Sequence, residues 1–171
     1  TLECDQGSDW EWGDDMGHPL FELTDTPPAT GPLGEGCHAQ IVVSEGEVAV
    51  DTPWTSTLLA PGVEVTVDGT TPLVVRFWHN WEWAGEDANE DVERRGQLIN
   101  DGDQVVGSVP LDSDSGTWAT WVQAEVALSV DVSGTYRVAF TLTSKPTDNA
   151  PGYTWTIDHV VLYTGSDPTP Q

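Results

Sequence analysis

Short stretches in which apolar and polar residues alternate constrain the fold of this chain more than any other feature. Leu73 to Trp83 is the longest of them, and Val63, Val65 and Val67 alternate with polar residues just before it. A period of two places successive side chains on opposite faces of a β-strand, so both segments are predicted to be strands. Three more predicted strands follow later in the chain: Trp121 to Val130, Tyr136 to Leu142 and Tyr153 to Tyr163.

Turn signals between these stretches predict antiparallel hairpins. Asn100-Asp101-Gly102-Asp103 separates Leu98-Ile99 from Val105-Val106, and Asp-Gly readily supplies the positive φ angles of tight turns. Sustained helical periodicity is missing from the sequence, and the best candidate for a helical turn, Asn89 to Arg95, is short. Many short strands with such turns predict an all-β fold of at least eight strands, a two-sheet antiparallel β-sandwich of the jelly-roll type.

Length and composition favour a single domain followed by a short tail. The chain has 171 residues, which suits one domain better than two. We expect one β-sandwich module over residues 1–163, and a tail over residues 164–171 in which Pro and small polar residues alternate, as in linkers. A linker implies neighbouring domains, so the chain is interpreted as one module of a longer protein.

Net charge excludes several classes of partner. The chain has 29 acidic and five basic residues, for a formal net charge of −24. So few cations cannot form a basic patch, which excludes nucleic acid and anionic lipid as partners. No apolar run approaches the ~20 residues needed to span a bilayer, so membrane insertion is not expected either. The acidic residues are interpreted as a solvated shell that salt screens, with metal sites and cationic partners left open.

The two cysteines of the chain would form a disulfide in an oxidising compartment. Cys4 and Cys37 are the two cysteines, and neither lies in a C-x-x-C pair or a zinc-binding pattern. A Cys4–Cys37 disulfide would stabilise the fold by roughly 3–4 kcal/mol on chain-entropy arguments; the alternative is two free buried thiols. The chain also begins without a Met or an apolar signal segment, as a processed protein or a trimmed one would. We therefore expect a secreted, extracellular or cell-surface protein.

Tryptophan is abundant, with nine residues in the chain. An indole ring can stack on a sugar or anchor a protein partner. Four tryptophans lie beside acidic, loop-like sequence and are the candidates for ligand binding at the surface: Trp10, Trp12, Trp81 and Trp83. If the strand from Leu73 stays regular past Asn80, however, Trp81 and Trp83 share its core-facing side, while Arg76 and Trp78 point away.

The sequence gives no support for catalysis. Pairs such as Glu82 with Glu86 can be posed as the two carboxyls of a glycosidase, but among 29 acidic residues such pairs arise by chance. The four histidines show no H-E-x-x-H spacing, and no serine lies in a G-x-S-x-G motif. A non-catalytic accessory module is therefore expected, of the kind attached to secreted hydrolases.

Several segments resemble the MAM-like jelly-roll modules of immune-inhibitor-type secreted proteases and of cell-surface proteins. The similar segments are Leu2-Glu3, Asp9 to Gly13, Leu58 to Pro61, Val75 to His79 and Tyr153 to Val160. The resemblance runs from Glu3 to about Tyr163, and related patterns occur in jelly-roll carbohydrate-binding modules. It implies a β-sandwich fold and an extracellular location.

The same resemblance implies a structural calcium ion. The opening Glu3 and the closing Asp158 match acidic positions of calcium-bearing jelly rolls, in which the first and last strands lie side by side. Backbone carbonyls near Gly34 to His38 would complete the shell of oxygens that calcium prefers. His159 stands where the family motif has a second Asp, which puts a metal role for that position in doubt. The alternative is that both acids belong to the solvated shell.

Three functions remain open at this stage, and an enzyme is the least favoured of them. A glycan-binding module with a structural calcium ion is favoured by the tryptophans. An adhesive or structural spacer, or a protein–protein interaction module of a secreted or cell-surface protein, is the alternative. The expected partner is accordingly a glycan or an extracellular protein.

Overall fold

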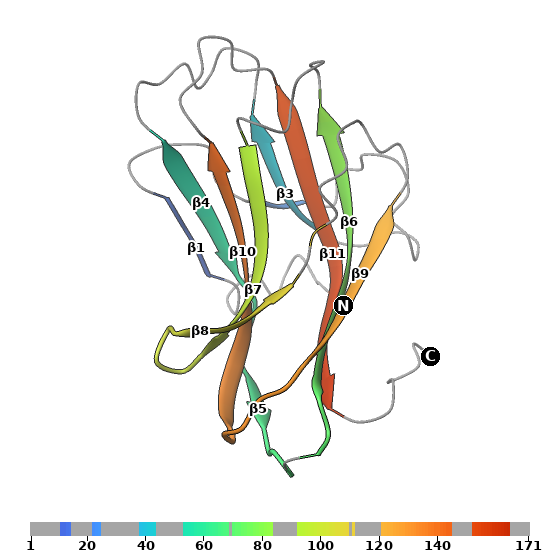
Figure 1. Cartoon of the computed structure of the whole chain (residues 1–171). Coiled ribbons are helices and arrows are strands. Elements are labelled where there is room, and N and C mark those ends of the chain that lie inside the picture. Colours follow the sequence, from blue (N-terminus) through green and yellow to red (C-terminus); the bar gives the residue numbers. More distant parts are fainter. Residues whose placement is uncertain are drawn as a thin grey trace.

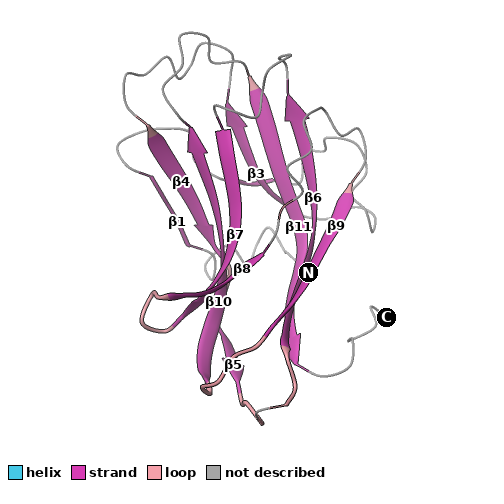
Figure 2. Ribbon diagram, in the orientation of Figure 1, coloured by secondary structure: helices cyan, strands magenta, loops and turns pink. Residues whose placement is uncertain are grey.

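The computed structural model describes residues 11–14, 22–24, 38–43, 53–68, 70–83, 92–109, 111, 121–144 and 152–164, and the fold is described over these ranges. They form eleven β-strands and contain no helix (Figure 2). Within these ranges there is consequently no helix long and apolar enough to cross a membrane.

The strands form two antiparallel sheets that lie face to face as two layers (Figure 1). The first sheet has the order β1 (Glu11–Asp14), β4 (Trp54–Leu59), β10 (Gly134–Ser144), β7 (Val92–Asn100) and β8 (Val105–Val109), and β5 (Val63–Val65) also pairs with β10. The second sheet has the order β2 (Glu22–Thr24), β3 (His38–Val43), β11 (Tyr153–Thr164), β6 (Leu73–Trp83) and β9 (Val122–Leu128). The predicted all-β antiparallel sandwich is confirmed.

Aromatic side chains from both sheets interlock in the core. Phe77 and Trp155 of the second sheet both contact Phe140 of the first, at ring-centroid distances of 4.9 and 6.1 Å. All three are fully buried, and edge-to-face packing of this kind adds to the free energy gained by burying their surface. The two sheets are therefore held together by the alternate side chains of each strand that face the core.

The predicted hairpin at Asn100 is present, with a different residue in the left-handed conformation. Strands β7 and β8 pair across the turn, and Asp103 has a φ of 55°. The side-chain oxygen of Asn100 accepts hydrogen bonds from the N–H groups of Gly102 and Gln104, both at 3.0 Å. These bonds fix the turn so that the positive φ falls on Asp103, a residue type that tolerates it, rather than on Gly102.

The best candidate for a helical turn, Asn89 to Arg95, is a strand in its described part. Val92 to Arg95 form the start of β7 and pair with β10 from Ser144 to Thr141. Cross-strand pairing along a nine-residue strand stabilises this polar segment as strand, whereas one isolated helical turn has no apolar face to bury. At the end of the chain, β11 extends to Thr164, and residues 165–171 of the predicted tail lie outside the described residues.

Ser56 provides a test of how the core tolerates a polar group. Its side chain is fully buried on β4 between Trp54 and Leu58, and its hydroxyl has no hydrogen-bond partner among the described residues. Because a buried, unsatisfied hydroxyl destabilises the folded state, Ser56→Ala is expected to raise the free energy of unfolding by about 1 kcal/mol. Urea denaturation measures this. As a control, Thr55→Val should destabilise, because the Thr55 hydroxyl bonds to Thr143 at 3.0 Å. A loss of stability in Ser56→Ala would contradict the assignment.

Candidate functional site

The two outer faces of the sandwich differ in how far they are open to solvent. On the second sheet, Arg76 and Asn80 of β6 point away from the core, yet the Arg76 side chain is only 12% exposed and Asn80 only 7% exposed. Their neighbour on β11, Thr156, is 1% exposed and accepts a hydrogen bond from Gln40 Nε2 at 3.1 Å. The centre of this face is therefore closed to a large ligand.

The outer face of the first sheet is polar and partly exposed. On β7 the two-residue period directs Glu93, Arg95 and Gln97 outward, and the side chains of Arg95 and Glu93 are 56% and 44% exposed. The register places Thr143 of β10 between Glu93 and Thr55 of β4. We refer to the outward residues of these three strands as the β4–β10–β7 face: Thr55, Thr57, Glu93, Arg95, Gln97, Thr141 and Thr143.

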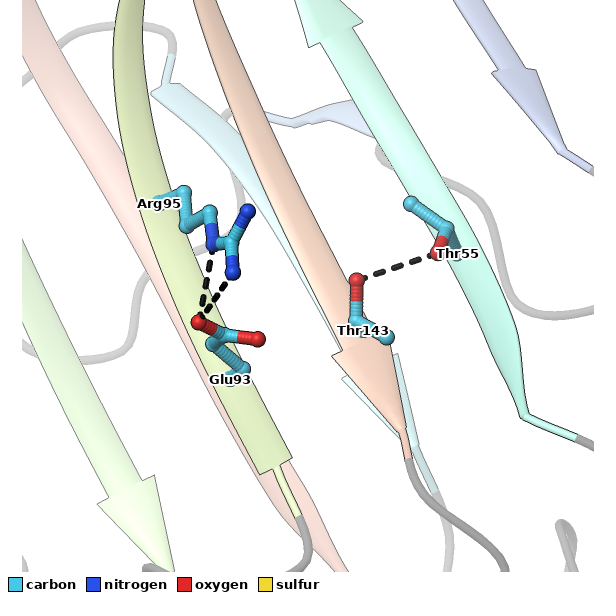
Figure 3. A network of polar contacts seen from close by, with 4 residues as sticks. All are labelled: Thr55, Glu93, Arg95 and Thr143. Atoms are coloured by element: carbon cyan, nitrogen blue, oxygen red, sulfur yellow. Dashed lines mark hydrogen bonds and ion pairs between the residues drawn. The ribbon is translucent and has the colours of Figure 1, made fainter. Parts of the chain in front are cut away.

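Two hydrogen-bonded pairs organise this face (Figure 3). Arg95 Nε and Nη2 both donate to Oε1 of Glu93, at 2.8 and 2.6 Å. The hydroxyls of Thr55 and Thr143 lie 3.0 Å apart on neighbouring strands. Strands are about 4.8 Å apart, so the face spans roughly 10 Å from β4 to β7. It therefore presents hydroxyl, carboxylate and guanidinium groups on a backbone fixed by sheet pairing.

Beneath the face, Arg94 points between the sheets and joins them. Its guanidinium carbon lies 4.4 Å from the centroid of the Trp81 ring and 6.0 Å from that of Trp155. Burial lowers the pKa of Arg94 to about 10. Burial, with a smaller contribution from the charge of Arg94, also lowers the pKa of His79 to about 4. The strand that carries Glu93 and Arg95 is thus anchored from below by cation–π contacts.

The expectation that Trp81 is a surface residue is wrong. Trp81 is 2% exposed and packs on Tyr153, with ring centroids 5.3 Å apart. The reason is that β6 stays regular to its end, where it pairs with β11 in the register Trp81↔Trp155, so the two-residue period directs Trp81 into the core. Its ring is consequently not available for stacking on a ligand from solvent.

The other tryptophan candidates stay predictions. Trp12 lies on β1 in register with Leu58, and Trp83 ends β6, but the side chains of both are outside the described residues. Trp10 is outside them altogether. Trp78 is partly exposed on the outer side of β6, as the alternation predicts.

Sequence reasoning missed the β4–β10–β7 face. Its signal was nevertheless in the sequence, because Thr55-Ser56-Thr57 and Thr141-Leu142-Thr143 both place two threonines on one side of a strand. Threonine is common on exposed strand faces, so this pattern alone indicates a strand rather than a site.

Of the expected calcium ligands with a named side chain, Asp158 is described. It lies at a bulge of β11, its side chain is 13% exposed, and its Oδ1 accepts a hydrogen bond from the N–H of His159 at 2.6 Å. Among the described residues, no hydrogen bond is donated to its Oδ2. His159 takes a φ of 55° here, and burial lowers the pKa of its imidazole.

The remaining expected ligands lie outside the described residues. These are Glu3 and the carbonyls from Gly34 to Cys37, so the calcium site stays a prediction. In the part of the chain that is described, no three His, Cys, Asp or Glu side chains gather closely enough to hold a metal ion. The Cys4–Cys37 disulfide also falls outside the described residues and stays a prediction.

Comparisons with known proteins agree with the fold. No protein-family model and no curated protein match the sequence. Among solved structures, TmCBM61 in complex with β-1,4-galactotriose matches with a TM-score of 0.59 and 15% identity over 95% of this chain and 94% of that one. TmCBM27, a carbohydrate-binding module with specific mannan recognition, matches with a TM-score of 0.53 and 11% identity over 96% and 93%.

A third solved structure, of promiscuous carbohydrate-binding modules from the β-sandwich superfamily, matches with a TM-score of 0.53 and 12% identity. The match covers 94% of this chain and 60% of that one. At such identities the similarity concerns the fold. The chain is thus a β-sandwich with the jelly-roll fold of solved carbohydrate-binding modules, whereas the MAM-like resemblance rests on sequence motifs alone.

Proposed function

We propose that the chain is a non-catalytic, extracellular glycan-binding module whose β4–β10–β7 face binds the glycan. The observation that carries this proposal is the contrast between the buried centre of the second sheet's outer face, at Asn80 and Thr156, and the partly exposed polar face around Glu93 and Arg95. A sheet holds these groups in place before binding, which reduces the entropy lost on association. Solved structures of the same fold that are named for galactotriose and mannan support the proposal.

The chemistry of the face suits a neutral glycan. Sugar hydroxyls both donate and accept, so they can bond to the carboxylate of Glu93 and the guanidinium of Arg95, and charge-assisted bonds of this kind are among the strongest in water. A net charge of −24 repels acidic glycans at long range. Stacking by Trp10, Trp12 and Trp83 remains part of the proposal and would add apolar contact.

Binding to neutral polysaccharides is expected to survive high salt, because it depends on hydrogen bonds and stacking rather than on net charge. Insoluble-polysaccharide pull-down and a glycan array, each at low and high salt, measure this.

Replacing Glu93 and Arg95 together by Ala should weaken binding at least tenfold, since hydrogen bonds to charged groups contribute about 1.5–3 kcal/mol. As a control, Glu125→Ala on the second sheet should bind normally. If the wild-type protein binds no glycan, an adhesive spacer or protein-interaction module becomes the better interpretation.

The proposal includes a structural calcium ion, bound by Glu3 and Asp158 with carbonyls near Gly34 to His38. The partly buried carboxylate of Asp158 supports it, because a bound cation would offset the cost of burying a charged group. Bound calcium would supply positive charge to a strongly acidic protein. The Cys4–Cys37 disulfide and an extracellular location belong to the same proposal.

A further inference from the structure

The Glu93–Arg95 pair leaves hydrogen-bonding groups of opposite character facing solvent. Both donors of Arg95 that contact the carboxylate, Nε and Nη2, use the same oxygen, Oε1 of Glu93. Glu93 Oε2 and Arg95 Nη1 make no contact within the described residues, and both side chains are about half exposed. A strong acceptor and strong donors therefore lie side by side at the edge of the β4–β10–β7 face.

This arrangement discriminates between ligand groups. A carboxylate or sulfate on a ligand would bind Arg95 but be repelled by Glu93, and an ammonium group would meet the reverse problem. A single hydroxyl would use one half of the pair. Two hydroxyls on adjacent carbons can use both halves, because one donates to Oε2 of Glu93 while the other accepts from Nη1–H of Arg95.

We propose that the Glu93–Arg95 pair determines specificity by binding the vicinal diol of a neutral pyranose residue. This inference rests on the proposed function and narrows its ligand class. Internal residues of 1,4-linked neutral polysaccharides keep free hydroxyls on carbons 2 and 3, and so offer the diol at every unit. Internal residues of 1,3-linked polysaccharides have no such pair, and 2-acetamido sugars lack the hydroxyl on carbon 2.

The neighbouring side chains extend the same surface. Thr143 is in register with Glu93, Thr141 is in register with Arg95, and Thr55 continues the first row onto β4. Each threonine hydroxyl can donate and accept, so a second sugar ring lying across the strands would meet further partners. The strand spacing of about 4.8 Å sets the distance between these partners.

The test measures affinities for polymers, so that chain ends contribute little. Titration calorimetry compares 1,4-linked galactan and 1,4-linked mannan with 1,3-linked glucan. Each 1,4-linked polymer is also tested after periodate cleavage of its vicinal diols and borohydride reduction, against a mock-treated sample. Binding to the 1,4-linked polymers is expected to be at least tenfold tighter than to the 1,3-linked one, and to fall at least tenfold after periodate treatment.

Variants assign the effect to the pair. Glu93→Gln and Arg95→Lys should each weaken binding to untreated 1,4-linked polymer about tenfold, because the first removes the charged acceptor and the second removes the planar fork. Glu125→Gln is the matched control, since Glu125 also pairs with an arginine, Arg76, at 3.8 Å, but on the outer face of the other sheet. Thermal melting checks that all variants fold.

The outcomes separate the inference from the function on which it rests. A wild-type protein that binds none of these polymers and no glycan on the array overturns the proposed function together with the inference, whereas binding to array glycans alone overturns only the inference. Binding that resists periodate, that extends equally to the 1,3-linked glucan, or that survives both Glu93→Gln and Arg95→Lys overturns the diol assignment and leaves glycan binding standing.

Discussion

Lowering the pH from 7.5 to 4.5 should reduce the free energy of unfolding by about 2–3 kcal/mol through a single buried imidazole, that of His79. His79 is 1% exposed and packs on Phe77, with ring centroids 5.5 Å apart. Burial and the charge of Arg94 lower its pKa to about 4 in the folded protein, whereas the value for an unperturbed histidine is 6.5. Between these two values the unfolded chain binds a proton that the folded chain does not, so stability falls as the pH falls through this window.

Urea denaturation at pH 7.5 and pH 4.5 measures the effect in the wild-type protein and in His79→Gln, which cannot titrate. The variant should lose about 2–3 kcal/mol less than the wild type between the two pH values. Asp68 affects the free energy of unfolding in a lower pH range. Hydrogen bonds from Thr70 and Thr71 hold its pKa far below the usual value. The stability contributed by its charged form is therefore kept until the pH falls below about 4. If both proteins respond equally to pH, the acid sensitivity has another source.

Much of the fold could be predicted because its determinants are local. The two-residue period of Leu73 to Trp83 gave the bounds of β6, and the hairpin at Asn100 followed from turn chemistry within five residues. Tyr153 to Tyr163 likewise matched β11 to within one residue. In each case the side chains that determine the strand or the turn are neighbours in sequence, so the local sequence pattern is enough to predict it.

The candidate site could not be predicted in the same way, because it depends on contacts between distant segments. Acidic neighbours in sequence suggested that Trp81 is exposed, yet pairing with Trp155, far along the chain, carries it into the core. Arg94 belongs to a polar segment with no apolar pattern, and only the packed structure shows its guanidinium stacked on those two indoles. How far each outer face is exposed depends on contacts between segments that are distant in sequence, and local sequence contains no signal for those contacts.

Calcium is expected to raise the melting temperature of the protein, provided that Glu3 and Asp158 bind it as proposed. Removing the ion would leave two carboxylates close together, and one of them, Asp158, is only 13% exposed and so poorly solvated. Folding and binding are then linked. At a calcium concentration of about 100 times the Kd the folded state gains about 2.7 kcal/mol. For a domain of this size that corresponds to a rise of roughly 5–11 °C.

Thermal melting with calcium and with chelator, at fixed ionic strength, measures this rise without confusing it with general screening of the acidic shell. Asp158→Asn should lose most of the calcium-dependent shift, because the amide oxygen is neutral and a weaker ligand for a hard cation. Asp131→Asn is the control: it makes the same change of charge at an exposed position and should keep the shift. Magnesium should have a smaller effect, since it demands a tighter octahedral shell. An equal response to both cations, unchanged in Asp158→Asn, would mean that divalent ions only screen the charge of the protein and that no specific site exists.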